Sequence, residues 1–249
     1  MSIAPPSPRR GTEGSRRALG WTFAFAVTMG FFEAAVVVYL NRLQSLGELS
    51  VPPGFPALVS PGSPASLLIL TEVLREAASL LMIASVACLA ARGAVARLAQ
   101  AAVIFGIWDI CYYLFLRLLI QFPETLLSWD VLFLIPRPWV GPVLAPLLVS
   151  AALVAGGLHA LSRERRGEGL RPAPWKWGVA LLGGLLVILS FMLDTPAEFD
   201  GTNFPSRFRW PLFLAGLALG AAAYLSSLRR PPAPAPPAHL RTAASGEPG

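Results

Sequence analysis

Long apolar runs separated by short polar segments make up most of this chain. Several of the runs exceed the roughly 18 consecutive apolar residues that are typical of a transmembrane helix. The pattern predicts helices at residues 19–41, 66–91, 98–121, 138–161, 174–193 and 210–228. The expected fold class is therefore all-α: a polytopic membrane protein with six transmembrane helices bundled over residues 19–228.

Three segments depart from this pattern. Residues 1–18 and 229–249 are rich in Pro, Ala, Ser, Gly and Arg, a composition that predicts disordered tails. Residues 123–137 are largely apolar but too short to span a bilayer, so we expect a re-entrant or interfacial segment there. Two arrangements stay open for its Trp129-Asp130 pair: a lid over charged residues of the bundle, or a surface segment anchored by tryptophan.

The composition agrees with a membrane protein. Apolar residues make up 55% of the chain, charged residues 14%, and the mean hydropathy is +0.60. The net charge of +6 does not indicate nucleic-acid binding, because the basic residues lie at helix ends, where they set membrane topology. The two cysteines, Cys88 and Cys111, both lie in apolar runs, which argues against a disulfide framework.

The distribution of basic residues predicts the orientation. With six crossings and a cytoplasmic N-terminus, 14 of the 20 basic residues fall on the cytoplasmic side, which satisfies the positive-inside rule. Both termini are then cytoplasmic. The basic residues are 19 arginines and one lysine, Lys176, a bias typical of GC-rich bacterial genomes. We therefore expect a bacterial cytoplasmic (inner) membrane protein.

Charged residues inside the predicted helices are the main functional signal. Charges in a membrane span cost free energy and usually pair or serve a function. Glu72, Arg75 and Glu76 share one helix face at i, i+3 and i+4. Counting about 1.5 Å per residue from the helix ends puts them level with acids of two other helices, Glu33 and Asp109. The five charges would form one layer in the outer half of the bilayer.

Further residues extend this candidate ion- or substrate-binding site. Tyr113 and Arg117 follow Asp109 at i+4 and i+8, and Asp130 belongs to the candidate lid. Crowded carboxylates in a low-dielectric layer tend to bind a proton or a cation. The alternative is structural: the acids and Arg75 would form ion pairs that only hold the bundle together. The two histidines lie away from this layer, His159 at the cytoplasmic end of the fourth predicted helix and His239 in the C-terminal tail, which disfavours zinc hydrolases with histidine ligands.

Three functions follow from this pattern. The first is a small transporter or a proton- or ion-binding protein with its site in the acidic layer. The second is an intramembrane enzyme acting on a lipid or isoprenoid-linked substrate, with the carboxylates as acid and base or as oxygen ligands of a metal. The third is a structural or assembly subunit. Gly216 and Gly220 form a GxxxG motif, which indicates close helix packing and in some proteins a homo-oligomer interface.

Four short runs carry a resemblance to other proteins. They are Phe31-Phe32-Glu33-Ala34, Glu72-Val73-Leu74-Arg75-Glu76-Ala77-Ala78, Trp108-Asp109-Ile110-Cys111-Tyr112-Tyr113, and Trp129-Asp130-Val131-Leu132-Phe133-Leu134-Ile135-Pro136. They resemble segments of uncharacterised bacterial multi-pass membrane proteins, over roughly the first two-thirds of the chain. The resemblance implies no established activity and assigns no residue a role.

Overall fold

A computed structural model describes residues 9–45, 64–135, 137–196 and 204–228. Its six helices are α1 (Arg9–Ser45), α2 (Pro64–Ala90), α3 (Ala94–Ile120), α4 (Leu144–Arg165), α5 (Pro174–Met192) and α6 (Trp210–Leu228). All six are long and apolar enough to cross a membrane. The prediction of an all-α, six-helix membrane protein is confirmed.

Of the two predicted tails, residues 1–18 and 229–249, the structure describes only residues 9–18. Residues 1–8 and 229–249 lie outside the described residues. Residues 9–18 do not form a tail, because they continue α1 as regular helix from Arg9. The apolar stretch of α1 that could cross a membrane begins at Arg17, so the additional turns precede the span.

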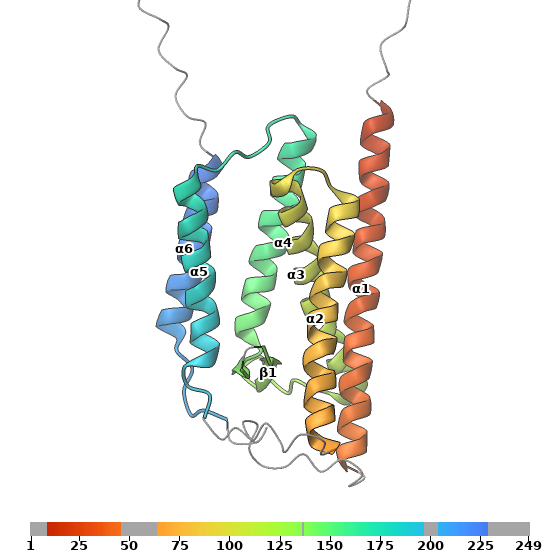
Figure 1. The fold of residues 1–249 in the computed structure, drawn as a ribbon, viewed down its shortest axis with the longest axis vertical. Coiled ribbons are helices and arrows are strands. Elements are labelled where there is room, and N and C mark those ends of the chain that lie inside the picture. The colour runs from red at the N-terminus through yellow and green to blue at the C-terminus, as the bar shows by residue number, and fades with distance from the viewer. Residues whose placement is uncertain (1–8, 46–63, 136, 197–203, 229–249) are drawn as a thin grey trace, which may run out of the picture.

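The helices form two groups (Figure 1). Helix α3 is central to the first group and packs against α1, α2 and α4, while α5 and α6 pack mainly against each other. The α5–α6 pair meets the first group through the strand β2 (Trp139–Pro142) and through α4. We call the end of the bundle that carries the β-hairpin the hairpin end, and the opposite end, where α1 begins and α6 ends, the termini end (Figure 1).

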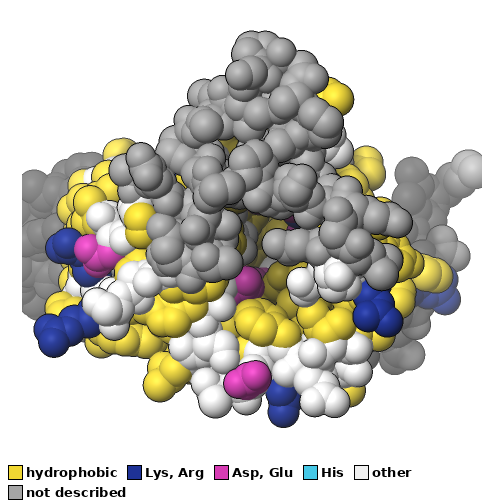
Figure 2. Space-filling view, turned by 90° about the horizontal axis from the view of Figure 1, so that it is seen from below, with side chains coloured by type: hydrophobic (Ala, Val, Ile, Leu, Met, Phe, Trp, Pro, Cys, Tyr) yellow, Lys and Arg dark blue, Asp and Glu magenta, His cyan; other side chains and the backbone are white. Residues whose placement is uncertain are grey.

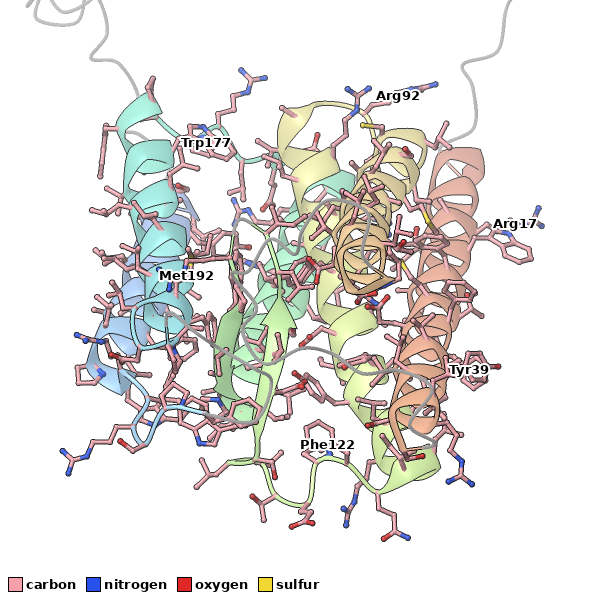
Figure 3. The ribbon with its side chains drawn as sticks, turned by 60° about the horizontal axis from the view of Figure 1, so that its bottom comes forward. Arg17, Tyr39, Arg92, Phe122, Trp177 and Met192 are labelled. Carbon is pink, nitrogen blue, oxygen red and sulfur yellow. The ribbon has the colours of Figure 1, made fainter. Side chains whose placement is uncertain are left out.

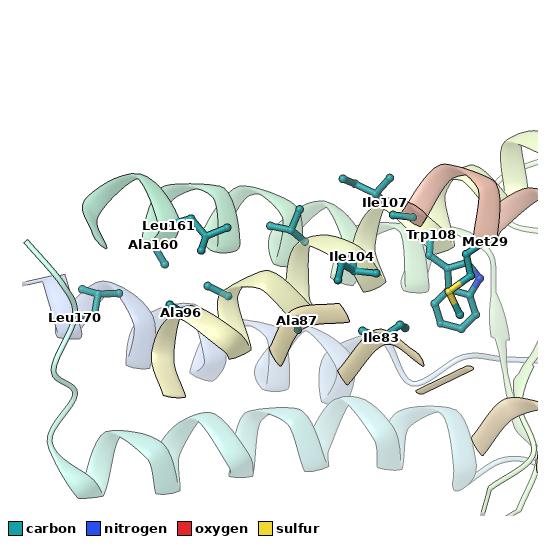
Figure 4. Close-up of a cluster of buried hydrophobic side chains, with 13 residues drawn as sticks. Met29, Ile83, Ala87, Ala96, Ile104, Ile107, Trp108, Ala160, Leu161 and Leu170 are labelled. Atoms are coloured by element: carbon teal, nitrogen blue, oxygen red, sulfur yellow. The ribbon is translucent and has the colours of Figure 1, made fainter. Parts of the chain in front are cut away.

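Alanine is frequent between the helices, and many large apolar side chains face outward. Of the 13 buried residues in the main apolar cluster of the first group, five are alanine (Figure 4). Leu81, Leu89 and Leu181 are among the many large apolar side chains that are exposed. Lipid solvates such side chains as well as a protein core does, so close approach through small residues stabilises a membrane bundle.

Glycines bring α5 and α6 into backbone contact. A Cβ added at Gly183 would lie 2.7 Å from the carbonyl oxygen of Gly216 and 2.8 Å from the nitrogen of Gly220. Gly216 is buried in the same contact. The GxxxG motif therefore packs α6 closely against α5 of the same chain, the helix-packing role predicted for it, and a homo-oligomer interface stays a prediction.

A two-stranded antiparallel hairpin, β1 (Trp129–Phe133) and β2 (Trp139–Pro142), occupies the segment between α3 and α4. The sequence predicted a non-spanning segment at 123–137 and a fourth helix from residue 138. The helix instead begins at Leu144, because residues 139–142 pair with β1. Gly141 permits this packing, since a Cβ there would lie 2.6 Å from the ring of Phe191.

Candidate functional site

A cavity of about 360 Å³ lies between the two helix groups. One wall is polar and comes from α1, α2 and α3: Glu33, Glu72, Arg75, Glu76 and Asp109. The opposite wall is apolar and comes from the hairpin, α4 and α5, with Trp139, Val149, Val187 and Phe191 among its residues. Figure 2, which views the hairpin end, shows acidic side chains near the middle of this face among apolar ones.

Arg75 forms ion pairs with two carboxylates. Its Nε and Nη2 donate to Glu72 at 3.0 and 2.5 Å, and its Nη1 donates to Glu33 on α1. The three side chains are at most 23% exposed. A guanidinium in this fork arrangement holds two carboxylates firmly but has little capacity left for another anion. This triad fits the structural alternative, because it ties α1 to α2.

Glu76 lies one turn beyond Glu72 and does not share Arg75. Both of its carboxylate oxygens accept the backbone N–H of Leu134, at 3.1 and 3.0 Å, immediately after β1. Glu76 is 7% exposed, and no basic side chain pairs with it in the described part of the chain. The hairpin thus lies against the acidic layer, as the lid alternative for Trp129-Asp130 expected.

Asp109 is the second cavity carboxylate without a basic partner among the described residues. Ser150 of α4 donates its hydroxyl to Asp109 at 2.7 Å. Gly106 makes this contact possible, because a Cβ there would lie 2.5 Å from the carbonyl oxygen of Ser150. The hydrogen bond keeps the carboxylate in place and leaves its charge uncompensated.

Tyr113 links the cavity to the hairpin. Its hydroxyl donates to Asp130 at 2.9 Å, and the backbone N–H of Val131 donates to the same carboxylate at 2.9 Å. Tyr113 lines the cavity, whereas Asp130 lies behind it. Burial raises the pKa of Asp130, which lies outside the six helices, to about 7, although both hydrogen bonds favour its ionised form.

The structure does not bring Arg117 to the cavity. Its Nη1 donates to the carbonyl oxygens of Gln121 and Pro123, at 2.6 and 3.0 Å, at the C-terminal end of α3. Gln121 adopts a left-handed conformation with φ 60° as α3 ends. Arg117 therefore satisfies carbonyls at a helix end, a position where basic side chains are favoured.

Sequence reasoning missed several residues of the site. Ser150 is fully buried and is the partner of Asp109. An isolated hydroxyl in the apolar run of α4 was the one signal that could have indicated it. The apolar wall gave no signal, because Trp139 and Phe191 look like ordinary membrane residues in sequence. Trp108 also borders the cavity, and its indole N–H has no acceptor among the described residues.

Among the described residues, no group of three or more His, Cys, Asp or Glu side chains is arranged to hold a metal ion. Comparison of the chain with protein-family models, curated proteins and solved structures found no match. The cavity and its residues are therefore the basis for assigning a function.

Proposed function

We propose that this protein is a small membrane transporter that binds a proton or a cation in the acidic cavity. The observation that carries the proposal is the contrast between Arg75 and the other acids. Arg75 is ion-paired with Glu33 and Glu72, whereas Glu76 and Asp109 line the same cavity without a basic partner in the described ranges. Two such carboxylates attract a positive charge in a low-dielectric site.

A proton or cation bound at Glu76 would lie among charged and polar groups from three helices and the hairpin. On α2 it has Glu72 and Arg75 beside it, and on α1 Glu33. Asp109, Tyr112 and Tyr113 of α3 line the same cavity. The hairpin contributes the N–H of Leu134. Asp130 lies behind Tyr113. Arg75 is the single basic residue in the cavity lining, so positive charge is needed for neutrality.

The proposed location is a bacterial inner membrane with both termini in the cytoplasm. Arg17, Arg92 and Trp177 lie toward the termini end, whereas Tyr39 and Phe122 lie toward the hairpin end (Figure 3). The last turn of α4 and the loop that follows it also carry basic residues: Arg163, Arg165, Arg166 and Arg171. By the positive-inside rule, that end faces the cytoplasm and the cavity lies in the outer half of the membrane.

The enzyme alternative receives less support from the geometry. An isoprenoid-linked substrate brings a phosphate, and four carboxylates of the lining repel an anion. Three of the five N–H groups of Arg75 already donate to Glu33 and Glu72, and these two carboxylates offset its charge, which weakens its attraction for a phosphate. The structural alternative accounts for that triad but not for two further acids that face the cavity without a basic partner.

The test is proton movement in proteoliposomes that contain a trapped pH indicator. Gradients of Na⁺, K⁺ and the membrane-impermeant cation benzyltrimethylammonium are imposed one at a time. At least one gradient should move protons across wild-type vesicles, and Glu76→Gln and Asp109→Asn should abolish the movement. Glu124→Gln is the matched control, because Glu124 is exposed and outside the cavity lining.

Two results would contradict the proposal. One is wild-type vesicles that respond like protein-free vesicles to all three gradients. The other is undiminished proton movement in both Glu76→Gln and Asp109→Asn, with each variant eluting as a folded protein in size-exclusion chromatography.

A further inference from the structure

We propose that the ligand of the cavity is an organic cation: an alkylammonium group joined to an aromatic or aliphatic body. The inference rests on the proposed function and names the substrate class of the same site. It follows from the cavity as a whole, because one wall attracts positive charge and the wall opposite it attracts apolar surface.

The charge of the ligand follows from the polar wall. Among the described residues, four carboxylates and one guanidinium line the cavity, which gives it a net formal charge of −3. Arg75 is held by Glu33 and Glu72, which leaves Glu76 and Asp109 to meet the ligand. A cation is stabilised in such a site, and an anion would lose its hydration without gaining a free basic partner.

The body of the ligand follows from the apolar wall. Seven of the described residues that line the cavity are aromatic, and three of them, Phe133, Trp139 and Phe191, belong to the apolar wall. Trp139 and Phe191 have nearly parallel rings, with an interplanar angle of 4° and centroids 6.5 Å apart. Aromatic faces attract ammonium groups and apolar bodies alike. A bare inorganic ion gains little from such a wall, and the described residues form no cluster suited to a metal ion.

The size of the cavity is consistent with such a ligand. A volume of about 360 Å³ lies at the lower end of the roughly 300–1,000 Å³ found for small-molecule sites. A single aromatic ring carrying a quaternary head is of suitable size. The Trp108 side chain is 6% exposed, and its indole N–H lacks an acceptor in the described part of the chain. An unsatisfied buried donor beside a cavity is independent evidence for an occupant, such as a water or a polar group of the ligand.

The experiment measures equilibrium binding by isothermal titration calorimetry, with the full chain in lipid nanodiscs of phosphatidylglycerol. The probe is benzyltrimethylammonium. Three compounds separate its properties: tetramethylammonium has the charge without the ring, benzyl alcohol the ring without the charge, and benzenesulfonate the ring with the opposite charge. We expect the probe to bind at least about tenfold more tightly than each of the three.

Two variants connect binding to the two walls. Glu76→Gln should weaken binding of the probe at least about tenfold, because a charge is lost. Glu124→Gln should leave the binding affinity unchanged. Trp139→Leu should weaken the binding of benzyltrimethylammonium and leave the binding of tetramethylammonium nearly unchanged. Thermal unfolding of each variant, compared with wild type, separates loss of binding from loss of fold.

The alkylammonium could come from a water-soluble compound or from a lipid head group. Repeating the titration in phosphatidylcholine nanodiscs distinguishes these sources. Unchanged binding supports a soluble ligand, and competition by the lipid supports a choline-like head group; both agree with the inference.

The inference is overturned if the probe does not bind, if benzenesulfonate binds as tightly, or if folded Glu76→Gln binds as wild type does. When Na⁺ or K⁺ moves protons in proteoliposomes but benzyltrimethylammonium does not bind, the ligand class is wrong and the transporter stands. When the probe binds but no gradient moves protons, transport is wrong and the ligand class stands.

Discussion

The carboxylate of Glu76 and the backbone N–H of Leu134 join α2 to the hairpin at the edge of the cavity, through contacts of 3.1 and 3.0 Å. A residue that could carry charge for transport thus also holds the non-helical segment in place. Irregular backbone within a membrane bundle is stable only where protein groups satisfy it. Any occupant that competes for Glu76 therefore also acts on the hairpin.

Substitutions of Glu76 should separate its charge from its role as an acceptor. Glu76→Gln keeps an oxygen for the Leu134 N–H and should unfold within a few degrees of wild type. Glu76→Ala leaves that N–H unpaired, which costs roughly 1–3 kcal/mol. We expect a clearly lower melting temperature for Glu76→Ala, measured by thermal unfolding in detergent. Equal melting temperatures for the two variants would show that the hydrogen bond contributes nothing.

Removal of Arg75 should destabilise the bundle more than removal of an exposed arginine. Arg75→Gln leaves Glu33 and Glu72 facing each other without a counter-charge, and breaking a buried pair in this way costs about 3–5 kcal/mol. A second change, Glu33→Gln, should restore part of the loss because it removes one of the unpaired charges. Melting temperatures of wild type, both single variants and the double variant test this. If the double variant is less stable than Arg75→Gln, the triad does not act as an ion-paired unit.

The acidic layer could be predicted from the sequence alone. Every helix crosses the same bilayer, so the distance of a residue from the helix end gives its depth. Counting residues from the helix ends put Glu33, Glu72 and Asp109 at one depth, and the cavity lining includes all three. Arg117 was assigned to the site because it follows Asp109 at i+8, and that helix-face argument failed. A residue at i+8 is about 80° further round the helix than Asp109 and about 12 Å nearer its end. Its long side chain therefore reaches the carbonyls that follow α3.

The hairpin could not be predicted from hydropathy. An apolar run such as residues 129–142 suits a buried strand as well as a helix, since burial on both sides removes the alternation that marks a strand. Its pairing depends on Gly141 packing against Phe191, a residue 50 positions later in the sequence. The apolar wall of the cavity was missed for the same reason, since its residues meet only through tertiary contacts.

Asp130 should make stability depend on pH. Its pKa is about 7 in the folded protein, above the value of about 3.9 for an unfolded aspartate. The folded state binds this proton more tightly, so the contribution to stability is full below pH ~4 and is lost as pH rises through ~7. We expect the melting temperature of wild type to fall relative to Asp130→Asn between pH 5 and pH 8. A difference between the two proteins that stays constant with pH would contradict the raised pKa.

Two adjacent glycines of α5 provide a matched pair for the helix contact. Gly183→Ala places a Cβ 2.7 Å from the carbonyl oxygen of Gly216, and overpacking of this kind costs about 1–3 kcal/mol. At Gly184 a Cβ meets nothing within 4 Å, so Gly184→Ala should be neutral or slightly stabilising. Thermal unfolding of the two variants tests the packing of α6 on α5. Equal stability would show that the two helices do not approach as closely as described.

Filling the cavity should block its ligand without unfolding the protein. Gly184 lines the apolar wall, and open space lies in front of its Cα. Gly184→Phe would place a ring in the cavity, so binding of benzyltrimethylammonium should weaken at least about tenfold while the melting temperature changes little. The matched control is Gly178→Phe, on the same helix at an exposed position outside the cavity lining, where a Cβ also meets nothing. Because Gly184→Phe leaves every carboxylate in place, it separates occupation of the cavity from charge. Wild-type affinity in a folded Gly184→Phe protein would place the cation outside the cavity.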